Sequence, residues 1–429
     1  MGSTVWRLPR NPASTTSPAR LPTSADVVII GAGLTGLSCA YHLLESDPDA
    51  SVAVLDAAPL GSGASGKTMG MIAPGLGQGF AGLVRRIGLQ RATAIYTETR
   101  EAVRDVAEII AFEDIDCCYE HVGRLMVAHG EQGEARLLRQ AKALESAGQP
   151  CVRLNADELA ARINLETAAR KAKVAALFLP DAVTVDPLML LHGFARAVQA
   201  RGGEIHCDAR VADVVDGRRV TVRLASGAII KAGKVVLATA AESPKLANLT
   251  GRIIPVSIKV IATAPLTPEQ LALVGWKGRE SIVDSRKLFN YFRLTPDNRI
   301  VFGGGTPLYG LQDPPDYEDL EGELHQTFPH SHMLHVKHRW GGTIDYTLDG
   351  LPVVGPVRVD GNVLHAGGFC GHGIALGVRA GRWVADAIVA VPERRMHPDF
   401  RNTAPLVPGD WLRKTCFNLA SGWMRMRGI

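Results

Sequence analysis

The informative part of the chain opens with an apolar run, a glycine-rich turn and a helical pattern. Residues 27–30 are valine or isoleucine, residues 31–36 contain three glycines, and residues 37–44 carry apolar side chains at positions 37, 40, 41 and 44. β-Branched runs next to glycine favour strands, and a 3.6-residue period favours a helix. The pattern predicts a strand, a tight turn and a helix, followed by a second strand over residues 51–55.

The three glycines have the spacing Gly-x-Gly-x-x-Gly, which suits a phosphate-binding turn. Gly31 permits the turn, Gly33 lets backbone N–H groups reach a pyrophosphate at the helix N-terminus, and Gly36 lets the helix pack closely on the strand. Asp56 follows the second strand, 20 residues beyond Gly36. A carboxylate there accepts hydrogen bonds from a ribose diol and repels a 2′-phosphate. The segment predicts a dinucleotide site, and an incidental glycine-rich turn is the alternative.

Two further glycine-rich loops indicate a cofactor longer than NAD. The second glycine-rich loop of the chain, residues 61–70, follows Asp56 almost directly. The third, residues 367–373, lies between a predicted strand over 362–366 and a helical pattern near the C-terminus. Another predicted strand, over 234–238, stands between them in sequence. Elements from both ends of the chain fit FAD spread across a parallel sheet better than NAD confined to one half of it.

The composition excludes several classes of protein. The 429 residues are 46% apolar and 21% charged, and no apolar stretch reaches the length of a membrane-spanning helix, about 18 residues. A net charge of +4 is too small to indicate binding to nucleic acid. The length suits two or three domains. The seven cysteines include no Cys-x-x-Cys pair, which argues against a disulfide framework and a cysteine zinc site. It favours a reducing compartment, and we expect the cytoplasm.

Several segments, taken in order, resemble a known family. These segments are residues 27–38, 61–66, 291–305, 327–329, 339–340, 347–352 and 371–373. They resemble the D-amino-acid oxidase superfamily (DAO family) of FAD-dependent amine and amino-acid oxidoreductases, which includes sarcosine and glycine oxidases. Within it the chain is most similar to the gamma-glutamylputrescine oxidase-like amine oxidoreductases. The resemblance spans residues 25–429.

The resemblance implies an α/β fold with two domains. One is a Rossmann-type, glutathione-reductase-like FAD-binding domain, and the other is a mixed α+β substrate domain like that of D-amino-acid oxidase. The expected boundaries are an N-terminal arm (1–24), an FAD-binding domain (25–99, 175–250 and 350–395), a substrate domain (100–174 and 251–349) and a C-terminal tail (396–429).

The resemblance also implies a set of cofactor contacts. The expected residues are Gly31, Gly33, Leu34, Thr35, Gly36, Asp56, Gly63, Ala64, Ser65, Gly66, Lys67, Val211, Thr239, Ala240, Trp340, Gly342, Gly368, Gly371, His372, Gly373 and Ile374. His372 lies between two glycines, and contact with substrate or flavin and simple turn packing both stay open. Tyr291 alternates with Arg293 in a strand expected to floor the substrate cavity, and it either lines that cavity or belongs to the core. Arg339 and Trp340 are expected under the ring system.

Departures from the family pattern bear on how the flavin is attached and on which substrates fit. Sarcosine oxidases attach their flavin through a cysteine shortly before the segment that matches residues 347–352. Residues 339–352 of this chain contain no cysteine, so we expect non-covalent FAD. The lysine that holds a substrate carboxylate in those enzymes corresponds to about Ala375, which disfavours a simple α-amino acid. Their lysine for O2 corresponds to a position near Val301. The second glycine loop departs from the family pattern at Lys67.

The implied reaction is oxidation of the C–N bond of a small-molecule amine, such as a polyamine derivative or related amino acid. Hydride passes to flavin N5, an imine forms, and O2 is the expected acceptor. No general base is assigned, because the lone pair of a neutral amine assists the departure of hydride from the adjacent carbon. The site contributes positioning and electrostatics. Two alternatives stay open. One is a quinone-linked dehydrogenase of the same fold, and the other is a flavin-binding subunit or assembly protein without turnover of its own.

A histidine-dense run and one cysteine can be explained without a metal site or a reactive thiol. The run comprises His330, His332, His335 and His338. Alternation puts His330 and His332 on one strand face, and no acid or cysteine completes a ligand set, so no metal site is expected. Cys370 is expected to pack as a small hydrophobe in its loop.

The two ends of the chain carry weaker signals. Residues 1–24 predict a loose arm or one strapped to the surface. Residues 411–427 predict a basic, amphipathic helix, which we expect to dock on the body or on a second subunit of a homo-oligomer rather than on a membrane.

Overall fold

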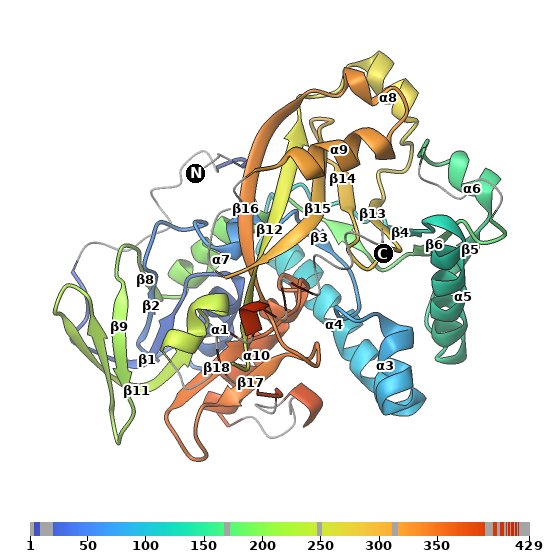
Figure 1. Cartoon of the computed structure of the whole chain (residues 1–429). Helices are drawn as coiled ribbons and strands as arrows, with labels where there is room; N and C mark the ends of the chain where they lie inside the picture. The colour runs from blue at the N-terminus through green and yellow to red at the C-terminus, as the bar shows by residue number, and fades with distance from the viewer. Residues whose placement is uncertain are drawn as a thin grey trace.

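The chain folds around two large sheets that meet in the middle of the molecule (Figure 1). The computed structural model describes residues 4–8, 20–166, 172–246, 251–310, 316–390, 398–400, 404–406, 409, 411, 413–415, 417 and 419. The two sheets draw on both halves of the sequence, so segments far apart in the chain lie side by side.

The first sheet is mainly parallel and has β1 (Ser24–Ile30) near its middle. Its other strands are β2 (Val52–Leu55), β8 (Glu204–His206), β9 (Val211–Val215), β10 (Val220–Leu224), β11 (Ile229–Leu237), β17 (Val353–Pro356) and β18 (Val363–Gly367). The order is β17-β18-β11-β1-β2-β8, with β10 and β9 attached to β11. Strand β1 pairs in parallel with β11 and β2. Its valine and isoleucine run is buried because a parallel sheet is covered on both faces.

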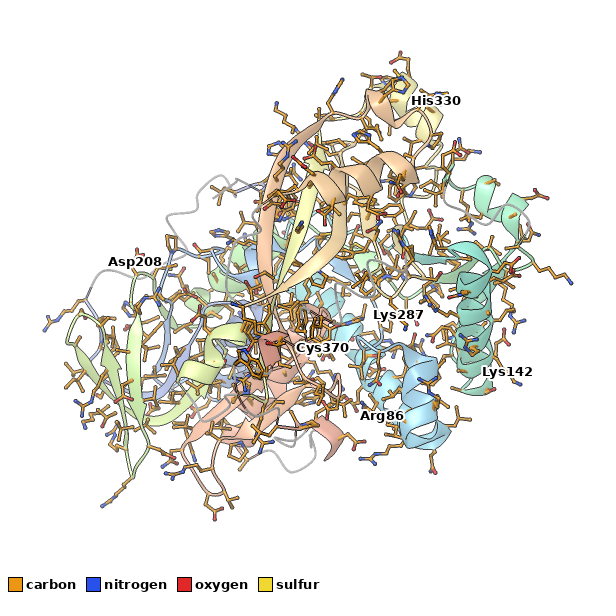
Figure 2. All side chains as sticks on the ribbon, viewed as in Figure 1. Arg86, Lys142, Asp208, Lys287, His330 and Cys370 are labelled. Atoms are coloured by element: carbon orange, nitrogen blue, oxygen red, sulfur yellow. The ribbon has the colours of Figure 1, made fainter. Side chains whose placement is uncertain are left out.

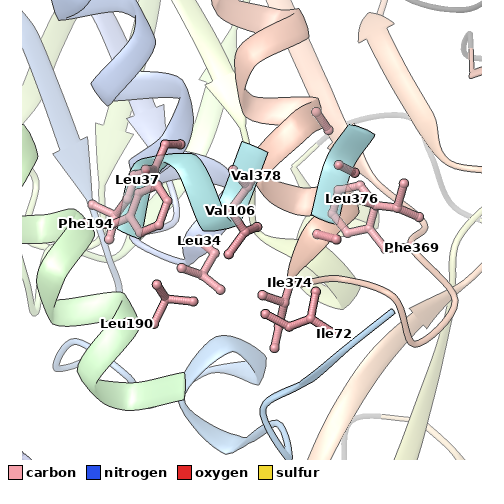
Figure 3. Packing of buried hydrophobic residues seen from close by; sticks show 14 of the residues in the cluster. Leu34, Leu37, Ile72, Val106, Leu190, Phe194, Phe369, Ile374, Leu376 and Val378 are labelled. Carbon is pink, nitrogen blue, oxygen red and sulfur yellow. The ribbon is translucent and has the colours of Figure 1, made fainter. Parts of the chain in front are cut away.

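Helices α1 (Leu34–Ser46), α4 (Leu89–Phe112), α7 (Pro187–Ala200) and α10 (Ala375–Ile388) pack beside this sheet. Figure 3 shows Leu34 and Leu37 of α1 packed among apolar side chains of the other three helices. Helices α1 and α10 approach closely: the Ser38 hydroxyl donates to the carbonyl of Val378 at 2.6 Å. A Cβ at Gly381 would lie only 2.6 Å from the carbonyl oxygen of Thr35, so glycine is needed at this crossing.

The second sheet is mostly antiparallel. Its strands are β4 (Arg124–Val127), β5 (Val152–Leu154), β6 (Ala176–Leu179), β12 (Ile254–Thr263), β13 (Ser281–Asp284), β14 (Tyr291–Leu294), β15 (Ile300–Tyr309) and β16 (Val336–Tyr346). The order is β16-β12-β15-β14-β13-β4-β6-β5. An aromatic core lies on one face, where the rings of Phe292 and Phe302 stack with centroids 5.1 Å apart. Trp276 and Phe328 pack against Phe292.

The remaining α-helices and strands complete the fold. They are α2 (Ala64–Lys67), α3 (Phe80–Ile87), α5 (Gly130–Ser146), α6 (Ala156–Ala160), α8 (Pro268–Val274), α9 (Glu318–Thr327), β3 (Met71–Ile72) and β7 (Val183–Thr184). Among the described helices, none is long and apolar enough to cross a membrane.

The histidine run does not form the strand face that its alternation predicts. Residues Ser331–Met333 form a 3₁₀ turn, His330 has a φ of 53°, and β16 begins after it, at Val336. The prediction of a shared strand face for His330 and His332 is therefore wrong, because a turn precedes the strand. Figure 2 shows His330 at the outer tip of the molecule, away from Cys370 at the centre.

Described residues near both ends of the chain contact the body. Trp6 is 8% exposed, and the main-chain N–H of Arg7 donates to Asp186 at 3.1 Å. In the tail, Arg413 donates to the Tyr309 hydroxyl at 3.2 Å, and Phe417 packs on the same ring. The rest of the helix expected over 411–427 falls largely outside the described residues.

Candidate active site

A cavity of about 980 Å³ opens where the two sheets meet. Its walls include the residues that follow β1, β2 and β11, the residues that precede α10, and side chains of β12 and β16. Ligands of open α/β sheets bind beyond the carboxyl ends of the strands. The fold thus brings the three predicted glycine-rich loops together around one space.

The first loop leaves the N-terminus of α1 available to a ligand. Gly33 is the N-cap, and neither a side-chain cap nor an acid occupies the first turn. The N–H of Leu34 donates to the Ser65 hydroxyl at 3.1 Å. Gly31 has a φ of 108°, and a Cβ there would lie 2.5 Å from the carbonyl oxygen of Ala238. Uncapped N–H groups and the helix dipole favour an anion such as a pyrophosphate at this point.

Asp56 ends β2 at the edge of the cavity. One carboxylate oxygen accepts from the N–H of Ala32 at 2.8 Å, and the other accepts from the N–H of Ala58 at 3.0 Å. Burial raises the pKa of this carboxyl, while the backbone donors oppose the rise. These contacts hold the carboxylate in one orientation beside the first loop, where a ribose hydroxyl can donate to it.

The second glycine loop is locked from behind by Trp340. Its indole N–H donates to the carbonyl of Lys67 at 2.9 Å. A Cβ at Gly66 would lie 2.1 Å from the carbonyl oxygen of Gly61, so this loop cannot accept a side chain there. Lys67 itself lines the cavity opposite Gly342.

The third loop is held by the buried carboxylate of Asp345. It accepts from the N–H of Gly368 at 2.5 Å, and the Asp345 carbonyl accepts from the N–H of Cys370 at 3.0 Å. Burial raises the pKa of the Asp345 carboxyl to about 6. Burial also raises the pKa of the Cys370 thiol to about 12, so the thiol is protonated at neutral pH.

His372 follows in the same loop and faces the cavity. Burial, together with the nearby charge of Arg124, lowers its pKa to about 4. The imidazole is therefore neutral at physiological pH. Its Nδ1 atom is buried without a hydrogen-bond partner in the described part of the chain.

One part of the cavity wall is aromatic and basic. Its walls include Tyr96 of α4, Arg124 and Met126 of β4, Tyr291 of β14 and Tyr346 of β16. Burial raises the pKa of Tyr96 and of Tyr346 to about 12 and raises that of Tyr291 as well. These phenols keep their protons at neutral and moderately alkaline pH, so they can donate hydrogen bonds to a substrate.

Most of the predicted site residues line this one cavity. They are Gly31, Gly33, Leu34, Thr35, Asp56, Gly63, Ala64, Ser65, Lys67, Val211, Thr239, Ala240, Tyr291, Gly342, Gly371, His372, Gly373 and Ile374. The predicted residues Gly36, Gly66, Trp340 and Gly368 instead support the wall: each packs against a loop that forms it.

Arg339 does not meet the expectation for the cavity, whereas Arg293 supports the second glycine loop. Arg339 points away and pairs with Glu321 at 2.6 Å, because alternation along β16 puts it on the face opposite Trp340. Arg293 donates to the carbonyl of Gly70 at 3.0 Å beneath the cavity floor. Sequence reasoning missed Tyr96, Arg124 and Tyr346, and no motif marks them.

The residues present fit FAD. The uncapped α1 N-terminus suits the pyrophosphate, Asp56 suits a ribose diol, and the space continues past Ile258 and Val260 toward the third loop. The three regions are connected in one cavity, as a dinucleotide that carries a ring system at its far end requires.

Comparison with known proteins gives the family. The model of the DAO family, described as FAD dependent oxidoreductase, matches residues 26–387. The chain belongs to this family of flavoenzymes, and FAD is its cofactor. It is an FAD-dependent oxidoreductase of the amine and amino-acid oxidase type.

Individual relatives agree with this assignment. The gamma-glutamylputrescine oxidoreductase of Escherichia coli (strain K12) is 32% identical over 377 residues, covering 86% of this chain and 85% of the relative. The sarcosine oxidase subunit beta of Arthrobacter sp is 26% identical over 353 residues, covering 80% and 82%. The crystal structure of glycine oxidase from Geobacillus kaustophilus has a TM-score of 0.69 at 21% identity, covering 90% of this chain and all of that one. The likeness of fold confirms the predicted α/β class with its second domain.

Proposed function

We propose that the protein oxidises a C–N bond of an amine that carries a remote polar group, such as a polyamine derivative, with O2 as the electron acceptor. The observation that carries this proposal is the cavity wall beside the third glycine loop, where the phenols of Tyr96, Tyr291 and Tyr346 border the space and can donate to a polar group of the substrate. Ala375 borders the cavity where a lysine for a simple α-amino acid is expected. The identity with the Escherichia coli relative supports the same substrate class.

When bound, FAD supplies a two-electron acceptor for the carbon next to nitrogen. The chain's own residues position the amine and exclude water. His372 is neutral at physiological pH, so it does not repel an amine, and the protonated phenols can hold polar groups of the substrate. No protein base is required, because the substrate reacts as the neutral amine.

Anaerobic mixing tests the proposal. The purified yellow protein is mixed without O2 with acylated polyamines, with sarcosine, with glycine and with D-alanine, and flavin absorbance is followed. We expect bleaching by the acylated polyamines and rapid recolouring when air is admitted. Reduction by the three amino acids but by none of the amines would overturn the substrate class. Bleaching without recolouring in air would overturn O2 as the acceptor.

We also propose a cytoplasmic location. The described cysteines 39, 117, 118, 151, 207 and 370 are all free thiols. This supports a reducing compartment, since oxidising compartments favour disulfides. Thiol titration of the freshly isolated protein under denaturing conditions tests the redox state, and a disulfide detected there would count against this location.

A further inference from the structure

Strand β4 presents alternate side chains to two different environments. Leu125 and Val127 point into the apolar core of the second sheet, whereas Arg124 and Met126 border the large cavity. Arg124 is thus a cationic group placed on the wall of the proposed substrate space, on a strand flanked by β13 and β6.

The guanidinium of Arg124 has little protein to bind. Its Nε lies 3.5 Å from the Ser281 hydroxyl, at the limit of a hydrogen bond. In the described part of the chain, no carboxylate lies within ion-pair distance of Arg124. Desolvation lowers its pKa to about 10, so it stays charged at neutral pH. Its charge is close enough to lower the pKa of His372.

Two other arginines at the same cavity are held by protein partners. Arg286 pairs with Asp284 at 2.7 Å and with Glu323 at 2.9 Å. Arg136 donates to the carbonyl of Ser285 at 2.6 Å. Arg124 therefore differs from these two in facing the cavity with its terminal nitrogen atoms uncommitted; Arg210, the other described arginine on the cavity wall, is exposed to solvent.

A desolvated charge without a partner is costly, and folded proteins rarely retain one. The planar guanidinium fork matches a carboxylate, which it binds through two parallel hydrogen bonds. We infer that Arg124 binds a carboxylate of the amine substrate and selects for substrates that carry one. This inference rests on the proposed function and narrows it: the remote polar group of the amine is an anion.

A matched pair of amines tests the inference on the full-length, FAD-loaded protein. N-succinylputrescine ends in a carboxylate, and its terminal carboxamide is the same size but neutral. The rate of anaerobic flavin reduction divided by the apparent Kd is measured for both. We expect the wild-type protein to favour the carboxylate, and Arg124→Gln to lower that value about 10- to 100-fold for the carboxylate and to leave the carboxamide nearly unchanged.

Two variants control for folding and charge. Arg153→Gln is the matched control, because Arg153 pairs with Glu145 on the surface of the same sheet; its preference should equal that of the wild type. Arg124→Lys keeps the charge without the fork and should retain part of the preference. It also replaces Arg124→Gln if that variant fails to retain FAD. Equal loss for both amines, or no preference in the wild type, would overturn the inference.

A titration separates this inference from the proposed function. Glutarate, which cannot be oxidised as an amine, is added while the visible spectrum of the bound flavin is followed. We expect saturable binding that Arg124→Gln weakens at least 10-fold, about the effect of one charged hydrogen bond. If no amine reduces the flavin but glutarate behaves this way, the function fails and the carboxylate site stands. If glutarate binds both proteins equally, the site fails.

Discussion

The ring of Trp6 packs edge-on against the ring of Trp340, with centroids 6.2 Å apart and planes inclined by 79°. Trp340 in turn donates to the carbonyl of Lys67 in the second glycine loop. The guanidinium of Arg293 lies over the Trp6 ring, 5.2 Å from its centroid. Trp6, near the N-terminus, therefore supports the wall of the proposed flavin site from behind.

Trp6→Ala should loosen this wall. Removing a buried tryptophan typically costs about 3–5 kcal/mol, and we expect a loss toward the lower end because the segment is terminal. FAD should dissociate faster as well, since the second loop loses its support. Chemical unfolding and FAD fluorescence measure the two effects. Trp411→Ala is the control, because Trp411 is 76% exposed. An equal effect of both changes would contradict the supporting role of Trp6.

Asp56→Asn should weaken FAD binding by about 1–3 kcal/mol, the value of a charge-assisted hydrogen bond. The amide keeps one acceptor oxygen for the N–H of Ala32 or Ala58 and has none to spare for a ribose hydroxyl. Titration of the apoprotein with FAD measures the change. Asp49→Asn, at an exposed position before the same strand, should bind as the wild type does. Unchanged affinity in the Asp56 variant would mean that the ribose assignment is wrong.

Acid should release all of the FAD from the protein. Residues 339–352 contain no cysteine for a covalent link. Cys370 borders the cavity, but its thiol, with a pKa raised to about 12 by burial, stays protonated and unreactive. The test is to precipitate the protein with acid and measure flavin in both fractions. Yellow colour left in the pellet would contradict the prediction, and Cys370→Ser would then show whether this thiol is the link.

The rate of amine oxidation should rise with pH. The pKa of His372 is about 4, so it stays neutral from pH 6 to pH 10. Tyr96 and Tyr346 stay protonated over this range because their pKa values are about 12. Arg124 also keeps its charge up to about pH 9, because its pKa is about 10. The rise below pH 9 therefore comes from the substrate ammonium, with a pKa of about 10 for an alkylamine. Initial rates should climb toward that pKa, with the same profile in His372→Gln. A flat profile, or an inflection that His372→Gln removes, would be inconsistent with a neutral-amine reaction.

Asp345 should make the folded state less stable as pH rises. Burial raises its pKa to about 6 from 3.8, so the folded state holds the proton more tightly than the unfolded chain. The free energy of unfolding then falls between about pH 4 and pH 6, by roughly 3 kcal/mol in all. Asp345→Asn removes this titration and can still accept from Gly368. Urea unfolding at pH 4 and pH 7 should show that the wild type loses more stability than the variant between these pH values. Equal losses in the two proteins would rule out this role.

The loops of the flavin site could be predicted because their signals are local. A β-branched run, closely spaced glycines and an acid after the next strand determine β1, the turn and α1 within 33 residues, from Ser24 to Asp56. The helix pattern after Gly373 likewise marks α10. Such units depend on turn geometry and on helix and strand periods, which a sequence states directly.

The substrate end could not be predicted in the same way. The segment Arg124–Val127 forms a strand, but which of its faces meets the cavity depends on its pairing with β13. Ser281 of β13 is 157 residues beyond Arg124 in the chain. Trp6 depends equally on Trp340, its distant partner. Arg339 and Trp340 were assigned to one environment, although strand alternation separates them. These side chains are placed by packing between distant segments, for which no local pattern exists.

The close crossing of α1 and α10 has a consequence for biogenesis. Helix α1 ends at Ser46, and α10 ends at Ile388. At about 5–20 residues per second, synthesis separates the two by roughly 20 to 70 seconds. During that time the face of α1 that receives Gly381 stays uncovered on the nascent chain. The complete cofactor site therefore forms only at the end of translation. Premature termination anywhere before α10 leaves a chain that cannot close this site.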